Sequence, residues 1–157
     1  MRYVIANKGM KKISKKVGEF TNIEIEEGLT DIDKLHNFND NCIRHKEDLM
    51  SLLKKLKSDG KTIAGYAATS KSTTVMNYCG INSNHLDCIY DTTPLKQNKY
   101  SPGTHVLIKP HSEFKNNYPD YALLFGYNHL NEILEKEKDF IAKGGKWIVY
   151  VPKLHII

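Results

Sequence analysis

The chain has 157 residues, the length of one ordinary domain with at most a small appendage. Hydrophobic residues make up 40% of it, enough for a core, and no apolar run approaches the roughly 20 residues of a membrane span. The N-terminal apolar stretch is too short for a signal peptide, so we expect a cytoplasmic location and no membrane partner.

The formal net charge of +5 raises the question of nucleic-acid binding. Most lysines are dispersed among acidic residues, and the one local cluster consists of Lys8, Lys11, Lys12, Lys15 and Lys16. We therefore expect no nucleic-acid partner, whereas a basic surface also suits a diphosphate ligand.

The three cysteines, Cys42, Cys79 and Cys88, show no metal-ligand spacing, and their odd number argues against a disulfide framework. The seven histidines do not cluster either. We expect free thiols and no metal.

The first 29 residues are expected to form a separate appendage. Residues 2–6 resemble a strand, residues 8–16 a basic surface loop, and the apolar spacing over 17–25 predicts one short helix that Gly28 ends. The linker-like stretch 28–31 then divides the chain into an appendage, 1–29, and a main domain, 30–157.

A long helix is predicted to open the main domain. Thr30 is the predicted N-cap, with Asp33 at the capping-box position, and Gly60 follows the helix end. His45 falls on the apolar stripe, and we expect an ordinary helix residue there rather than a ligand. The stripe consists of Leu35, Phe38, Cys42, Leu49, Leu52, Leu53 and Leu56.

From Lys61 onward the pattern alternates between strands and helices. Strands are predicted at 62–66, 86–90, 105–109, 121–125 and 146–151. Helices are predicted at 72–79 and after Asn128, which we expect to cap a helix that Gly144 and Gly145 close. This order predicts an α/β, three-layer domain with a mostly parallel sheet and helices on both faces.

The stretch from Gly65 to Thr74 connects the first of these strands to its helix. Small residues allow a ligand close to the backbone, the helix N-terminus adds partial positive charge, and Lys71 adds a full charge. The stretch matches neither the dinucleotide fingerprint nor the P-loop. A phosphate site and a plain strand–helix turn both fit these features.

Two more loops follow predicted strands. In the long loop 91–104, Asp91 can accept from a ribose hydroxyl, Lys96 and Lys99 can neutralise a diphosphate, and Tyr100 can stack on a base or sugar. A turn cap and solvated lysines are the alternatives.

The loop 126–129 holds Asn128, which either caps the helix or faces the ligand, and His129, which no carboxylate accompanies in the sequence pattern. No nucleophile motif or SAM-binding glycine-rich loop is found. The residues alone indicate a nucleotide-type ligand binder rather than an enzyme.

Three blocks of residues carry a family resemblance. They are Gly-Tyr-Ala-Ala at 65–68 with Ser70-Lys71 and Asn-Tyr-Cys-Gly-Ile at 77–81; Asp-Thr-Thr-Pro at 91–94 with Lys96-Gln97 and Pro-Gly-Thr-His at 102–105; and Pro-Asp-Tyr at 119–121 with Asn128, Gly-Gly-Lys-Trp at 144–147 and Val151-Pro152. Together they resemble the C-terminal domain of SAM-dependent sugar C-methyltransferases, over about residues 2–155.

The resemblance implies a Rossmann-like domain that does not bind SAM and that supplies much of a nucleotide-sugar site. In such enzymes a zinc-binding domain and a central SAM domain precede it, and the catalytic histidine and tyrosine residues lie mainly in the central domain. This sequence contains neither domain, so it is either a piece of a longer protein or a separate natural domain. The resemblance also implies that residues 1–29 are the remnant of an interdomain connection. We therefore expect no methyl transfer by this chain alone, no cofactor bound by it, and a SAM-binding domain or subunit as partner.

The first hypothesis is the nucleotide-sugar-binding domain of a C-methyltransferase that acts on a nucleotide-linked keto-deoxysugar. Ser70, Lys71, Ser72 and Thr73 would hold the diphosphate, the loop from Asp91 to Tyr100 the nucleoside, and Asn128 the sugar. The expected substrate-binding residues are Gly65, Ala67, Ser70, Lys71, Ser72, Thr73, Asn77, Asp91, Lys96, Lys99, Tyr100 and Asn128. The alternative is a standalone, non-catalytic nucleotide-sugar-binding or partner-binding module. A nicotinamide-dependent oxidoreductase fragment is a third, disfavoured by the missing glycines.

Overall fold

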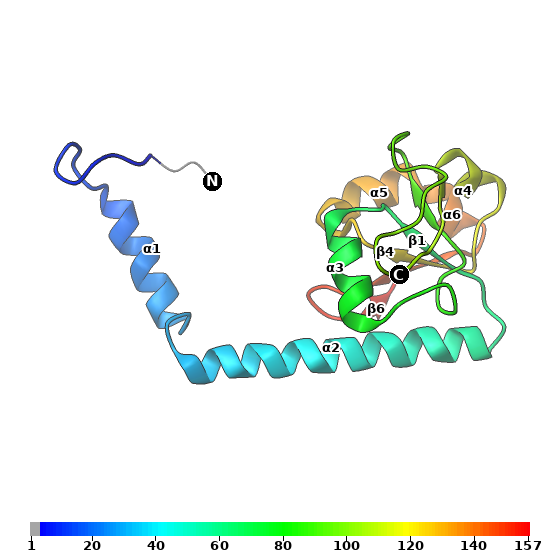
Figure 1. Cartoon of the computed structure of the whole chain (residues 1–157), viewed down its shortest axis with the longest axis horizontal. Coiled ribbons are helices and arrows are strands. Elements are labelled where there is room, and N and C mark those ends of the chain that lie inside the picture. The colour runs from blue at the N-terminus through cyan, green and yellow to red at the C-terminus, as the bar shows by residue number, and fades with distance from the viewer. Residues whose placement is uncertain (1–3) are drawn as a thin grey trace. The chain divides into compact units, whose positions relative to one another are not determined.

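The computed structural model describes residues 4–157 (Figure 1). These residues form two compact units, of which the first ends at Cys42 and the second begins at Ile43. Helix α2, Ile32–Ser58, contributes to both units. Among the described residues no helix is long and apolar enough to cross a membrane.

Helix α1, Lys15–Glu26, is the short helix predicted over residues 17–25, and it begins two residues earlier and ends one residue later. The Ser14 side chain caps it by accepting from the backbone N–H of Lys16, and Gly28 ends it with a left-handed φ of 76°. The strand predicted over 2–6 is absent from its described part, residues 4–6, and residues 2 and 3 lie outside the described residues. No residue of α1 is buried.

Helix α2 begins one residue later than predicted. The Asp31 carboxylate, not Thr30, occupies the capping position and accepts from the backbone N–H of Asp33 at 2.9 Å. The helix ends as predicted, with Gly60 at φ 72°. Of the predicted apolar stripe, Leu49, Leu53 and Leu56 are buried, whereas Leu35, Phe38 and His45 are exposed.

Six strands form one sheet in the second unit, in the order β3-β2-β1-β4-β5-β6. They are β1 (Ile63–Tyr66), β2 (Ile89–Asp91), β3 (Ile108–Pro110), β4 (Tyr121–Leu124), β5 (Lys146–Val149) and β6 (His155–Ile156). The first five run parallel, and β6 pairs antiparallel with β5. The mostly parallel sheet is confirmed, and β6 is an element that the sequence pattern did not predict.

Five helical elements connect these strands. They are α3 (Ser70–Cys79), α4 (Ser112–Asn116), the 3₁₀ helix η1 (Tyr127–His129), α5 (Leu130–Lys136) and α6 (Lys138–Ala142). The prediction of a single last helix is wrong, because the helical backbone is interrupted at Glu137, between α5 and α6. The cap predicted at Asn128 is also wrong, because this residue lies within η1 and caps neither η1 nor α5.

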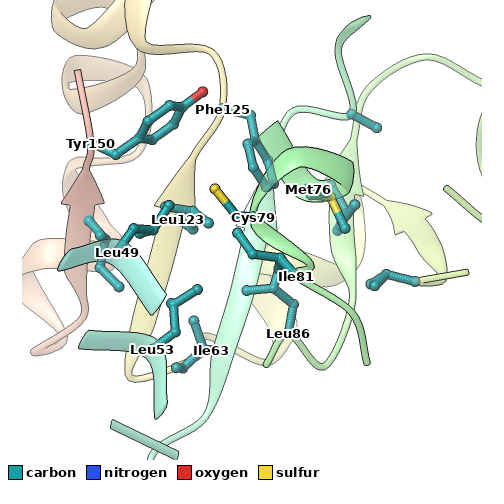
Figure 2. Close-up of a cluster of buried hydrophobic side chains, with 14 of the residues drawn as sticks. Leu49, Leu53, Ile63, Met76, Cys79, Ile81, Leu86, Leu123, Phe125 and Tyr150 are labelled. Carbon is teal, nitrogen blue, oxygen red and sulfur yellow. The ribbon is translucent and has the colours of Figure 1, made fainter. Parts of the chain in front are cut away.

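The sheet buries a separate core on each face, because successive strand side chains point to opposite sides. On one face α2 and α3 cover Ile63, Ile89 and Leu123, and Figure 2 shows Leu53 and Met76 approaching this layer. On the other face the buried side chains include Phe114 of α4, Phe140 of α6 and Trp147 of β5, and α5 also packs on this cluster. The second unit therefore has three layers, helix–sheet–helix, as predicted.

Candidate functional site

The strand order defines where a ligand is expected. From β1 the sheet extends through β2 and β3 on one side and through β4 and β5 on the other. Connections that follow β1 and β4 therefore leave the sheet on opposite faces, and the carboxyl ends of parallel strands at such a point commonly bind ligands. The connection after β2 lies beside the connection after β1.

The connection between β1 and α3 is only three residues long, Ala67 to Thr69. Ala67 has a φ of 72°, an uncommon conformation for alanine, and its N–H donates to the carbonyl of Tyr90. Thr69 caps α3, because its Oγ1 accepts from the N–H of Ser72 at 3.1 Å. This geometry places the N-terminus of α3 at the carboxyl end of β1, close to the sheet edge where ligands are expected.

Asp91 at the end of β2 holds two connections together. Its Oδ2 accepts from the N–H of Ala68 at 2.7 Å, and its Oδ1 accepts from the N–H of Thr93 at 2.7 Å. The residue is 6% exposed, and each of its carboxylate oxygens accepts a hydrogen bond from the protein's own backbone. Asp91 thus fixes the β1–α3 connection against the loop that follows β2. Its direct contact with a ribose stays a prediction.

Lys96 continues this link from the loop side. Its Nζ donates to the carbonyl of Ala68 at 2.8 Å and lies 3.8 Å from the carboxylate of Asp91. The side chain of Gln97 donates to the Asp91 carbonyl at 3.0 Å. The long loop is therefore ordered by contacts to the neighbouring connection.

The distal half of the same loop folds back on itself. The N–H of Ile108 donates to the carbonyl of Lys99, and Tyr100 forms an antiparallel bridge with Leu107. Asn77 of α3 joins this part, because its Nδ2 donates to the carbonyls of Thr73 and Pro102. The loop is thus attached to both the strand end and the helix.

These elements enclose a groove of about 270 Å³ at the carboxyl ends of β1 and β2. Tyr100, 63% exposed, stands at its wall, and the Lys99 side chain forms no ion pair with any described residue. The groove is lined by Ala68, Thr69, Ser70, Ser72, Thr73, Leu95, Lys96, Lys99, Tyr100, Ser101, Pro102 and Ile108. Six predicted site residues meet here: Ser70, Ser72, Thr73, Lys96, Lys99 and Tyr100.

The remaining predicted residues lie outside this lining. Gly65 is within β1, where a Cβ would lie 2.7 Å from the Phe125 ring, so glycine is needed there for packing. Lys71 faces the other way, with its Nζ 5.4 Å from the centre of the Tyr127 ring. Asn128 is exposed in η1.

A larger groove of about 440 Å³ lies between α2 and α3, lined by Lys46, Glu47, Met50, Ser51, Lys54 and Cys79. The thiol of Cys79 is buried, and burial raises its pKa despite the opposing effect of Lys46. This groove lies along two helices rather than at strand ends, and no helix N-terminus lines it. The smaller groove is therefore the better candidate for a ligand site.

A buried cluster on the opposite face of the sheet was not predicted. The hydroxyl of Tyr66 donates to Glu137 Oε1 at 2.9 Å, and His111 Nε2 lies 2.7 Å from the same oxygen. Burial and the Glu137 contact raise the pKa of Tyr66. The cluster ties the end of β1 to the segment before α4 and to the α5–α6 break. No motif signals it, because its residues are far apart in the sequence.

His129, which the sequence pattern left without a carboxylate, lies 3.2 Å from Glu132 on the surface. Within the described residues no group of three or more histidine, cysteine, aspartate or glutamate side chains is arranged to hold a metal ion. The three cysteines are free.

Residues 1–152 match the family described as the C-methyltransferase C-terminal domain. The chain is also similar to the C-methyltransferase NovU of Streptomyces niveus, with 32% identity over 141 residues. The match covers 90% of this chain and 34% of NovU, so the chain spans about a third of the length of that relative. The matched segment contains the whole sheet up to β5 together with the groove. The chain belongs to the family of C-methyltransferase C-terminal domains.

Proposed function

We propose that this chain is the nucleotide-sugar-binding domain of a SAM-dependent C-methyltransferase that acts on a nucleotide-linked keto-deoxysugar. The observation that carries the proposal is the groove at the carboxyl ends of β1 and β2. It combines a capped helix N-terminus, a lysine that forms no ion pair with any described residue, and an exposed tyrosine, and such groups suit a diphosphate and an aromatic base.

In this proposal each part of the ligand has its own contacts. The diphosphate lies at the first turn of α3, where Ser70 and Thr73 supply hydroxyl groups and Lys99 supplies charge. The nucleoside lies along Tyr100. The sugar extends toward Lys71 and Asn128, which lie on the β4 side of the α3 N-terminus. The main role of Ala67 and Asp91 is to hold the two connections in place rather than to contact the ligand.

The size of the groove supports a shared site. A volume of about 270 Å³ falls below the usual range of about 300–1,000 Å³ for pockets that enclose a drug-sized ligand. A nucleotide-sugar would therefore leave much of its surface uncovered here. A second protein surface, which we assign to a SAM-binding domain or subunit, would cover the rest.

The described residues do not fit SAM itself. A nucleoside cofactor in this fold rests on a glycine-rich turn and on a free acidic oxygen after the second strand. Here the turn has no glycine, and both oxygens of Asp91 are engaged by backbone N–H groups. SAM would supply the methyl group from the partner domain, and this chain's residues would bind and orient the sugar nucleotide.

Isothermal calorimetry with thymidine and uridine diphosphate sugars tests the proposal. We expect binding by the wild type, at least fivefold weaker binding after Lys99→Ala and after Lys71→Ala, and unchanged binding after Lys55→Ala. Lys55 is an exposed lysine near the end of α2 and serves as the matched charge control. Absence of binding to every sugar nucleotide would overturn the proposal and leave the non-catalytic, partner-binding alternative.

A further inference from the structure

Within the described part of the first unit nothing covers helix α1, although its sequence is unsuited to an isolated helix. It has 12 residues, none of them buried, and includes Gly18 and four β-branched residues. Isolated helices shorter than about 12–15 residues are marginal in water even when alanine-rich. Glycine and β-branched residues lower helix propensity further. A covering surface is therefore needed to stabilise α1.

One side of α1 carries a row of apolar side chains in its middle, from Val17 to Ile23. Val17, Phe20 and Ile23 are 55%, 51% and 47% exposed, respectively. With about 100° of rotation per residue, these three side chains fall within an arc of about 120°. Lys16 and Glu24 fall within the same arc, one at each end of the apolar row. Neither of them forms an ion pair with any described residue.

The row is self-complementary when reversed. Ile23 and Glu24 lie three and four residues after Phe20. Val17 and Lys16 lie three and four residues before it. Two antiparallel copies of α1 that cross at Phe20 would therefore place Val17 of each copy against Ile23 of the other. They would also place each Lys16 beside the opposite Glu24. A two-fold interface requires this reciprocity.

We propose that α1 is an antiparallel self-association surface that pairs with α1 of a second copy of this chain. The wider charge distribution agrees, because lysines dominate the segment from Lys8 to Lys16 and four glutamates follow between Glu19 and Glu27. Antiparallel pairing sets these segments of opposite charge side by side, whereas parallel pairing would set like charges together. The inference is independent of the nucleotide-sugar site.

Analytical ultracentrifugation of the full chain, from about 10 µM to about 1 mM, tests the proposal. We expect a reversible monomer–dimer equilibrium in the micromolar range, because a pair of 12-residue helices forms an interface at the small end of specific contacts. Phe20→Asp should remove the dimer. A wild-type chain that stays monomeric at about 1 mM would overturn the proposal.

A charge exchange tests the orientation. Lys16→Glu should weaken the dimer about tenfold, because two attractive contacts become repulsive, and Lys16→Glu combined with Glu24→Lys should restore it. Lys15→Glu, which makes the same change in net charge on the opposite side of α1, should leave the dimer within about twofold. Equal weakening by Lys16→Glu and Lys15→Glu, or no rescue by the double variant, would contradict the antiparallel pairing.

Discussion

Replacing Asp91 by asparagine is expected to destabilise the second unit by about 3 kcal/mol. The carboxylate accepts from two backbone N–H groups, each at 2.7 Å, at a position that is 6% exposed. Hydrogen bonds to a charged group contribute about 1.5–3 kcal/mol each. Asparagine keeps one neutral acceptor and turns an NH₂ group toward the other N–H, which leaves a buried donor unpaired.

The ion pair between Asp91 and Lys96 adds little to this figure. The two groups are 3.8 Å apart, and the Lys96 side chain is 43% exposed, so solvent screens the attraction. The backbone contacts therefore dominate the loss. Asp91→Ala, which removes both acceptors, should cost about 1 kcal/mol more.

Urea unfolding monitored by tryptophan fluorescence measures the change. Trp147 is the only tryptophan and is fully buried in the second unit, so its emission reports on that unit. With an m-value of about 1.5 kcal/mol per molar, the midpoint should fall by about 2 M. Asp59→Asn, a matched change at an exposed position after α2, should leave it in place. A midpoint for Asp91→Asn within about 0.3 M of wild type, at an unchanged m-value, would refute the reasoning.

Three further predictions concern the same unit. Gly65→Ala should destabilise it by about 1–3 kcal/mol, since the new methyl group would lie 2.7 Å from the Phe125 ring, whereas Gly18→Ala in α1 should leave the Trp147 transition unchanged. Glu137→Ala should cost about 3 kcal/mol in urea unfolding, because it leaves the Tyr66 hydroxyl and His111 without their buried partner; a loss below about 1 kcal/mol would contradict this role. Hydrogen bonds from the Thr62 backbone and hydroxyl lower the pKa of Asp120, so its stabilising effect should be complete above about pH 5 and lost as the pH falls through the depressed value. Asp120→Asn should remove this part of the acid dependence, which amounts to at most about 1 kcal/mol because the Asp120 side chain is 41% exposed. An acid-unfolding curve of the variant that is identical to that of the wild type would contradict this prediction.

The elements that the sequence predicted well are those whose pattern is local. The apolar period of α2 and the continuous apolar run of β4 identify both without knowledge of their neighbours. The N-cap of α2 was misplaced by one residue because Thr30 and Asp31 are both good capping residues, and only the backbone geometry selects between them.

The elements that were missed depend on distant contacts. The helical spacing of apolar residues continues from α5 into α6, yet the helix is interrupted at Glu137, which is buried against Tyr66 and His111. Strand β6 has only two residues, too few to show an alternating pattern. In the candidate site the position of Asp91 at a strand end was predictable. Its bond to Ala68 was not, because that residue belongs to another connection.

The attachments of the loop between β2 and β3 bear on how a ligand would bind. Lys96 fixes its first half to Ala68, a bridge from Tyr100 to Leu107 closes its second half, and Asn77 fixes Pro102, which lies inside that closed part, to α3. Such a loop is already ordered before any ligand arrives, so binding loses little conformational entropy. Association should then proceed in a single kinetic step, and amide hydrogen exchange at Asn98 and Ile108, which are hydrogen-bonded across the loop, should be slow in the free protein. Recognition would use a preorganised surface, and any large movement on substrate capture would fall to the partner that covers it.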